Sequence, residues 1–395
     1  MRGWRCVAAA MAVAVSCLGW FSAAAAPFVP GDDAQVLESG LPNTDPRVRQ
    51  MHDLAAQLAA APNSLPLAMH LAERQLAMGV AEADPRFVGY ARGTLAAWWH
   101  DGTAAPPLRI LRARIMQAQH EFAPASSDLR AALVEAPQSA EALLVLASID
   151  EATGDLVEAK DLCARFAQGH SGLAGVACVA SIGALTGNRK ASAEMLADAI
   201  QHISTLDRSQ LLWALTILGE TAIQGDDPAA DQYLREALAL DRGNVYALTV
   251  YADYLLEHGE APEVLRLLRG FERVDALYLR FALAAQATDD PQFPAYRADL
   301  AARFAAARLQ GDTVHLRDTA RFTLDIEHVP ARALGLASQN WQTGHKAPAD
   351  LRVLLATAVA CHDVAAAKPA LDWIAATRLE DATTERLVRR LVSGS

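Results

Sequence analysis

The sequence predicts an all-α fold in which antiparallel helix hairpins stack into a right-handed solenoid. Apolar residues recur at helical spacing along the chain after Pro46, with almost no strand-like alternation. A glycine followed by a polar residue recurs in steps of 33, 38 and 34 residues, at Gly154, Gly187, Gly225 and Gly259. Only 6% of the residues are aromatic, which indicates that small side chains let the helices pack closely.

The composition excludes two classes of protein. Hydrophobic residues make up 52% of the 395-residue chain, enough to build a core, so the chain is not intrinsically disordered. The chain carries 46 acidic and 35 basic residues, for a net charge of −11, and has no run of Lys and Arg. Nucleic acid is therefore not expected as a partner, because an acidic chain repels phosphates.

The first 25 residues are predicted to be a secretory signal peptide. Arg2 and Arg5 give a positive start, and the segment Cys6–Ala26 contains no charged residue and ends in small residues. Since Pro27 would be tolerated poorly directly after the cleavage site, we expect cleavage after Ala25. The mature protein would then be periplasmic or secreted and would have no integral membrane span.

Two alternatives to cleavage remain open. The uncharged stretch of about 21 residues is long enough to stay as an N-terminal membrane anchor. Lipidation of Cys17 is the other alternative, although the usual Leu three residues before it is missing.

The chain is predicted to have four segments. These are a signal peptide at 1–25, a lead and first helix at 26–61, a hairpin array at 62–274, and a divergent helical part with a capping helix at 275–395. In the last segment we expect helices at about 276–287, 294–310, 313–327, 330–343, 349–361, 364–376 and 381–392.

The best-patterned hairpin spans Ala140 to Phe166. Its key positions are Leu143, Leu146 and Ala147 on the first helix, Gly154 and Asp155 in the turn, and Ala159, Cys163 and Phe166 on the second helix. With these residues and this period, 106–271 resembles the tetratricopeptide repeat family, in an exported bacterial form. His120 replaces the turn glycine in the hairpin at 106–137, and the first helix of the hairpin at 211–244 is one residue shorter than the pattern.

The resemblance implies a non-catalytic protein-interaction scaffold of the cell envelope, because the first helix of each hairpin lines a concave groove in that family. The matching positions are Ile110, Arg114, Gln117, Glu141, Leu144, Ser148, Glu151, Ala174, Ala177, Ser181, Leu185, Leu212, Leu215, Tyr246, Thr249, Asp253, Leu256 and Glu257. This groove is apolar and small in its middle and acidic toward its ends. We therefore expect a protein or peptide partner with an apolar segment and basic flanks. The alternative is that Leu212 and Leu215 only pack under a neighbouring helix.

Three cysteines remain after cleavage, and they allow at most one internal disulfide. In the tetratricopeptide-like arrangement, Cys163 lies on the second helix of one hairpin and Cys178 on the first helix of the next. Both are about equally far from the turn between these helices, so they are predicted to form a disulfide. Two buried free thiols are the alternative.

The sequence shows no catalytic, cofactor-binding or metal-binding motif. The segment Gly169-His170-Ser171-Gly172 has Leu173 where a hydrolase nucleophile elbow needs glycine, and it follows a helix instead of a strand.

Two further hypotheses remain open. A metal-binding or enzymatic site would lie in the divergent C-terminal helices, around His315, His328 and Asp318. Alternatively, the chain is an envelope-assembly factor that binds glycan or lipid, although its acidic charge disfavours anionic lipid.

Overall fold

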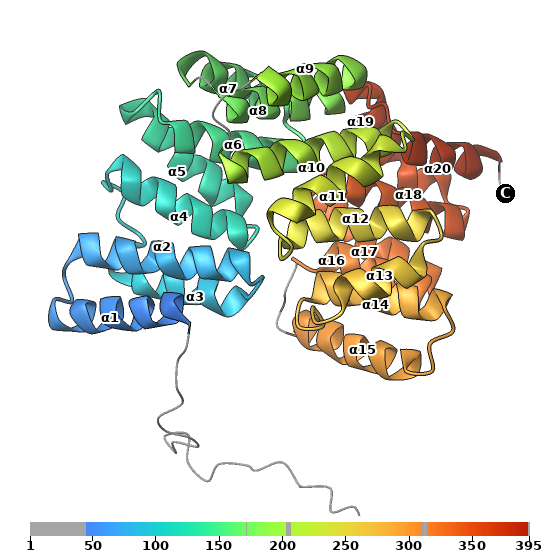
Figure 1. Ribbon diagram of the computed structural model, residues 1–395, viewed down its shortest axis with the longest axis horizontal. Coiled ribbons are helices and arrows are strands. Elements are labelled where there is room, and N and C mark those ends of the chain that lie inside the picture. The colour runs from blue at the N-terminus through green and yellow to red at the C-terminus, as the bar shows by residue number, and fades with distance from the viewer. Residues whose placement is uncertain (1–44, 171, 203–206, 310, 312–313, 394–395) are drawn as a thin grey trace, which may run out of the picture. The chain divides into compact units, whose positions relative to one another are not determined.

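The computed structural model describes residues 45–170, 172–202, 207–309, 311 and 314–393 (Figure 1). Within these ranges it has twenty α-helices and one short 3-10 helix, and no strand. Residues 47–395 form one compact unit. The predicted signal peptide lies outside the described residues, as does almost all of the lead before the first helix. No helix in the described ranges is long and apolar enough to cross a bilayer.

The helices of the first half follow one another with short connections. They are α1 (Pro46–Ala60), α2 (Leu65–Ala81), α3 (Pro85–Thr94), η1 (Ala96–Trp98), α4 (Pro106–Ala118), α5 (Phe122–Glu135), α6 (Ala140–Thr153), α7 (Leu156–Gly169), α8 (Leu173–Leu185), α9 (Arg189–His202), α10 (Arg208–Gln224) and α11 (Ala229–Leu240).

The second half continues the same alternation. Its helices are α12 (Val245–Glu257), α13 (Ala261–Leu268), α14 (Asp275–Ala287), α15 (Phe293–Leu309), α16 (Leu316–Asp325), α17 (Pro330–Gln342), α18 (Pro348–Cys361), α19 (Val364–Thr377) and α20 (Ala382–Ser393). The seven helices predicted after residue 275 are confirmed to within three residues at each end. The fold is therefore a tetratricopeptide-like all-α solenoid of helix hairpins.

One residue with a left-handed backbone marks the turn inside each hairpin. Gly154 ends α6 with φ of 83°, and the Asp155 side chain then accepts a hydrogen bond from the Glu158 amide to begin α7. The residues that take this conformation are Ala83, His120, Gly154, Gly187, Asp226, Gly259, Asp289, His328 and His362. Apart from Ala83, the residues that replace glycine are aspartate or histidine, which tolerate this conformation better than most residues.

The fourth predicted hairpin differs from expectation. Helix α10 is not shortened but begins at Arg208 and runs for 17 residues. The left-handed residue of its turn is Asp226, with φ of 56°, whereas Gly225 has φ of −88°. A Cβ at Gly225 would meet the guanidinium of Arg189, the mobile end of a flexible side chain.

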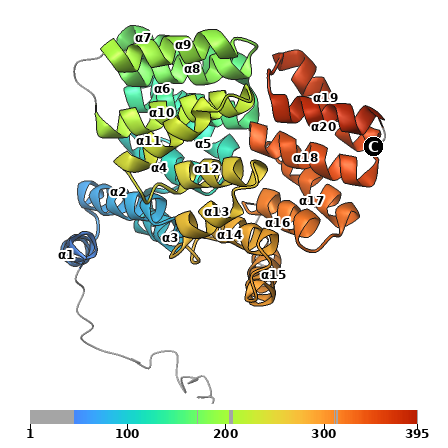
Figure 2. The same ribbon diagram turned by 45° about the vertical axis from the view of Figure 1, so that its right-hand side comes forward.

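The even-numbered helices form the inner side of the stack. From α4 onward, each even-numbered helix packs against the next even-numbered helix, and no pair of odd-numbered helices in the described chain packs as closely. The even-numbered helices therefore form a continuous row along the stack, and the turned view shows α10, α12 and α14 following one another in it (Figure 2).

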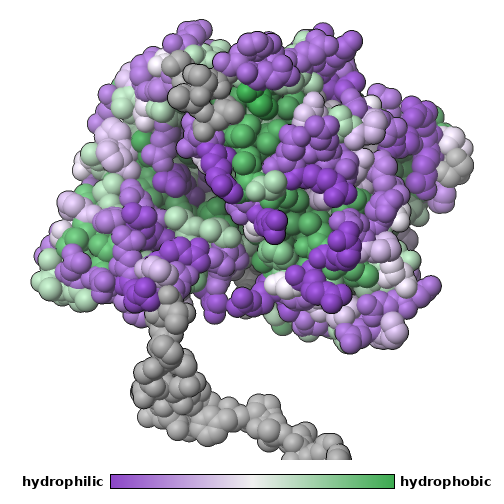
Figure 3. Space-filling view, in the orientation of Figure 1, coloured by the Kyte–Doolittle hydropathy of each residue, from purple (hydrophilic) through white to green (hydrophobic). Residues whose placement is uncertain are grey.

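The core runs along the stack instead of having one centre. One cluster joins α4 to α8 through small residues such as Ala113, Ala132 and Ala147, and others follow it. Each hairpin thus covers the apolar face of its neighbour. The face in Figure 3 is largely hydrophilic, with hydrophobic patches gathered toward its centre.

The predicted disulfide is confirmed. Cys163 on α7 and Cys178 on α8 are bonded, with their Cα atoms 5.4 Å apart, and Cys361 is a free thiol. Because the bond joins neighbouring hairpins, it fixes α7 against α8.

The C-terminal helices contact the hairpin turns of the array. The Lys346 amide donates a hydrogen bond to the Ala152 carbonyl (2.8 Å), and Arg386 pairs with Asp226 (3.5 Å). His120 and His345 share a hydrogen bond of 2.8 Å between ring nitrogens. Glu385, Arg386, Arg389 and Arg390 on α20 are exposed, as predicted for a capping helix.

Candidate partner-binding face

Polar contacts join the first helices of successive hairpins along the inner side. Between α4 and α6, Arg114 pairs with Glu141 (2.8 Å) and the Gln117 amide donates to the Ser148 hydroxyl (2.8 Å). All four residues were predicted to line a groove, and the structure brings them together in pairs. Glu141 and Ser148 are exposed to solvent.

Four residues further along form what we call the acidic inner patch: Glu151, Ser181, Glu220 and Tyr246. The Ser181 hydroxyl on α8 donates to Glu151 on α6 (2.7 Å). The Tyr246 hydroxyl on α12 donates to Glu220 on α10 (2.5 Å). Tyr246 is 60% exposed, a large value for an aromatic side chain in the middle of a stack.

The acidic inner patch favours protonated carboxyl groups. Burial raises the pKa of Glu220 to about 7; the Tyr246 hydrogen bond opposes this shift and the negative charge of Glu151 adds to it. Burial also raises the pKa of Glu151, against the hydrogen bond from Ser181. Loss of solvent around the Tyr246 hydroxyl raises its pKa well above the usual value. The negative charge of Glu220 and the hydrogen bond to it act in the same direction. Among the described residues, neither glutamate forms an ion pair.

In a second group of residues the carboxyl pKa values are lowered instead of raised. We call it the arginine network: Asp253, Arg280, Asp318 and Arg321. Arg280 is fully buried and donates to Asp253 (2.9 and 3.0 Å) and to Asp318 (2.8 Å). Arg321 also pairs with Asp253. Burial alone would raise the pKa of Asp253, but Arg280 and Arg321 outweigh it and lower that pKa.

Similar pairs continue to the end of the chain. Arg317 on α16 lies 3.8 Å from Asp350 on α18, and Arg352 on α18 pairs with Asp381 before α20. Arg352 also acts on the acidic inner patch, because its charge lowers the pKa of Glu220. The C-terminal helices therefore bring positive charge toward the acidic side of the stack.

The predicted groove residues divide into accessible and buried ones. Ile110 and Leu215 are each only 6% exposed, and both pack into the helix stack instead of facing a groove. Asp253 is not a free acidic point, because it is already paired with two arginines. Glu257 is exposed and accepts a long hydrogen bond from Thr383 (3.4 Å). The partly buried positions are Leu144, Ala174, Leu212, Thr249 and Leu256; Ala177 and Leu185 are buried.

Sequence reasoning missed Glu220 and Arg280. Glu220 lay in the hairpin whose first helix was misjudged in length, and the 38-residue step from Gly187 to Gly225 was the available signal. Arg280 lies where the repeat consensus fades, so nothing in the pattern placed it on the inner side.

The C-terminal histidines do not form a metal centre in the described part of the chain, where no cluster of three His, Cys, Asp or Glu side chains could hold an ion. Asp318 lies in the first turn of α16, whereas His328 lies in the turn that follows the end of this helix at Asp325. Asp318 is buried against Arg280. His328 and His362 occupy left-handed turn positions, which explains why histidines recur near helix ends.

No family model matches the chain, and no curated protein sequence matches it. Among solved structures, the chain is similar to the tetratricopeptide domain of P58(IPK), with 15% sequence identity and a TM-score of 0.21. The match covers 88% of this chain and 94% of that domain. The assignment of the fold rests on the helix order, the left-handed turns and the inner-side contacts.

Proposed function

We propose that the chain is a non-catalytic scaffold that binds a segment of a partner protein against its inner side. The observation that carries this proposal is the acidic inner patch. An exposed tyrosine there is oriented by Glu220, beside a second glutamate that also has no ion pair in the described chain. Buried or half-buried carboxylates are costly without a cation, so a positive group from a partner would be stabilised at this position.

The partner segment would carry a basic residue next to an apolar or aromatic one. Tyr246 offers an aromatic face for apolar contact or for a cation, and aromatic residues often contribute most to binding energy at interfaces. This refines the sequence-based expectation of basic flanks: Glu151 stays as an acidic contact, Glu220 is added, and Asp253 is removed because it is already paired with two arginines.

We further propose that the protein acts outside the cytoplasm, in the cell envelope or in secreted form. Support comes from the signal-like first 25 residues and from the Cys163–Cys178 disulfide, since stable disulfides form mainly in oxidising compartments.

Site-specific photo-crosslinking tests the binding face. A benzoylphenylalanine at position 246 is placed in the full-length mature protein, and a matched control carries it at Val157, which is 86% exposed on α7. After irradiation in a cell-envelope extract, we expect one recurrent cross-linked protein from position 246 and none from position 157.

The identified segment is then synthesised and titrated against purified protein. We expect Tyr246→Ala or Glu220→Gln to weaken its binding about tenfold. Equal cross-linking from both positions, or binding that neither variant changes, contradicts the proposed face.

A further inference from the structure

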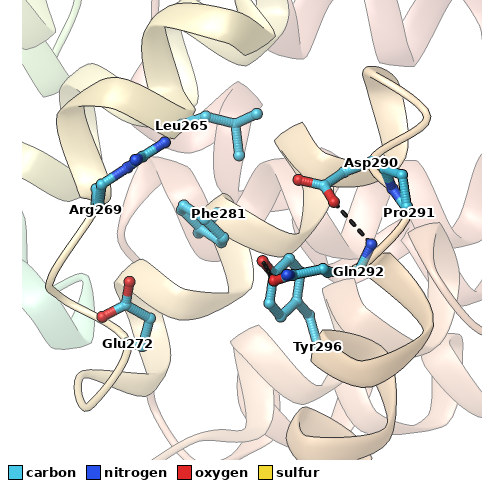
Figure 4. Close-up of a pocket in the computed structure, with 8 residues that line it drawn as sticks. All are labelled: Leu265, Arg269, Glu272, Phe281, Asp290, Pro291, Gln292 and Tyr296. Atoms are coloured by element: carbon cyan, nitrogen blue, oxygen red, sulfur yellow. Dashed lines mark hydrogen bonds between the residues drawn. The ribbon is translucent and has the colours of Figure 1, made fainter.

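A pocket of about 520 Å³ lies between α13, α14 and α15 (Figure 4). It is lined by Leu265, Arg269, Glu272, Phe281, Asp290, Pro291, Gln292 and Tyr296. This volume is in the range of sites that hold small ligands or single side chains with their flanking backbone.

The pocket lies next to an unusually short helix, α13. Helix α13 is only 8 residues long, whereas the second helices α5, α7, α9 and α11 have 12 to 14. The chain leaves α13 at Arg269 and reaches α14 through the loop that holds Glu272. Because α13 is short, the loop residues Arg269 and Glu272 complete the lining of the pocket beside Leu265 on α13 and Tyr296 on α15.

The floor of the pocket is aromatic. Phe281 and Tyr296 meet edge to face with ring centroids 5.3 Å apart. The Tyr296 hydroxyl donates to the Gln292 side-chain oxygen (2.6 Å), which fixes the tyrosine ring. Leu265 extends the apolar surface on the α13 side (Figure 4).

Two carboxylates stand on opposite sides of this floor (Figure 4). One oxygen of Glu272 accepts from the Gly270 amide (3.0 Å), and one oxygen of Asp290 accepts from the Gln292 amide (2.7 Å). These local bonds fix both carboxylates and leave one oxygen of each without a hydrogen bond from the described residues. Neither carboxylate forms an ion pair within the described chain.

We propose that this pocket binds a basic side chain, arginine or lysine, presented by a partner protein. The alkyl stem would lie on Phe281 and Leu265, and the cationic head would reach the free oxygens of Glu272 and Asp290. Arg269 lines the same edge as Glu272, but the two carboxylates still leave the pocket with a net negative charge that favours a cationic head between them. This site is separate from the acidic inner patch and does not depend on the proposed function.

The test uses the peptide acetyl-Gly-Arg-Gly-amide and its citrulline analogue, which has the same shape but no charge. Binding to the full mature protein is measured by calorimetry and by ligand-observed NMR. We expect the arginine peptide to bind about tenfold more tightly than the citrulline peptide. Glu272→Gln and Asp290→Asn should each weaken arginine binding about fivefold, since each removes one charged contact.

Two controls separate this site from other acidic surfaces. Glu260→Gln changes an exposed carboxylate outside the pocket, and Tyr246→Ala changes the inner patch; both should leave arginine-peptide binding unchanged. Thermal unfolding confirms that the pocket variants are folded. Equal binding of the two peptides, binding unaffected by both pocket variants, or no binding up to about 10 mM would each overturn the proposal.

Discussion

Glu220 on α10 accepts a hydrogen bond from a tyrosine, whereas Asp253 on α12 lies between two arginines. Both carboxylates face the inner side of the same stack. The pKa of Glu220 is raised to about 7 and that of Asp253 is lowered. A carboxylate that is paired inside the chain stabilises the fold. One without a cation holds its proton more tightly, and a positive group from a partner would favour its charged form. The comparison indicates a structural role for the arginine network and sets it apart from the acidic inner patch, where we propose that a partner binds.

The largest expected effect is on the arginine network. Arg280→Met leaves Asp253 and Asp318 without their shared partner in the protein interior. We expect the free energy of unfolding to fall by about 3 to 5 kcal/mol, as for other broken buried ion pairs. Urea denaturation followed by circular dichroism measures this loss. A loss below about 1 kcal/mol would mean that the network is not structural and would remove the contrast with the acidic inner patch.

The second largest effect is expected from removal of the disulfide, which joins α7 to α8, the helix that carries Ser181 of the acidic inner patch. Replacing both Cys163 and Cys178 with serine should cost about 3 kcal/mol in the chain-entropy account. Thermal unfolding gives the change in stability, and hydrogen exchange locates it. Exchange should accelerate in α7 and α8, next to Ser181, and stay unchanged in α14 and α16. Uniform acceleration would show that the two regions are not independent.

The two carboxylate environments predict opposite responses to pH. The low pKa values of Asp253 and Asp318 contribute stability that is present above about pH 4 and is lost as the pH falls through the folded-state values. The contribution of Glu220 to stability changes with pH in the opposite direction. Between about pH 4.5 and 7 the folded state binds its proton more tightly than the unfolded state does, so stability falls as the pH rises through this window.

Glu220→Gln tests that sign. In the natural protein, ionisation of Glu220 lowers the free energy of unfolding as the pH rises, and the variant lacks this contribution. On going from pH 5 to pH 8, the free energy of unfolding of the variant should therefore rise by about 1 to 2 kcal/mol relative to that of the natural protein. Urea denaturation at both pH values measures the difference. If natural protein and variant differ by the same amount at pH 5 and pH 8, Glu220 does not titrate in this window.

The smallest effect is expected at the solvent-exposed end of the inner side. Arg114 and Glu141 form an ion pair at 2.8 Å, but Glu141 is half exposed. Surface pairs of this kind contribute little, so Arg114→Gln should change stability by less than about 0.5 kcal/mol. Urea denaturation measures this change in the free energy of unfolding, with Arg280→Met as the reference. A larger loss would indicate that the whole inner side depends on charge pairing.

The sequence predicted the helices far better than it predicted the inner side. Helical periodicity located even the C-terminal helices, because each hairpin must bury an apolar stripe whatever its turn residue is. After residue 275 the glycine spacing is lost, because Asp289, His328 and His362 all take the turn conformation in place of glycine. The inner side was harder to predict, because its pairs join residues from different hairpins. Arg280 binds Asp253 and Asp318, which lie 27 and 38 residues away in the chain.

His120 and His345 are 225 residues apart in the chain, and their rings share a hydrogen bond. Leu156 and Leu185, at the turns of the array, pack in one cluster with Trp341, Leu354 and other C-terminal residues. Repeat proteins whose units touch only their neighbours can begin to fold anywhere and complete each unit as it emerges. Contacts of this separation slow folding, because a long loop must close before they form. The hairpins that hold Leu156 and Leu185 therefore lack part of their packing until the last four helices have been made. A product that ends before α17 leaves these two side chains uncovered, as targets for chaperones and proteases.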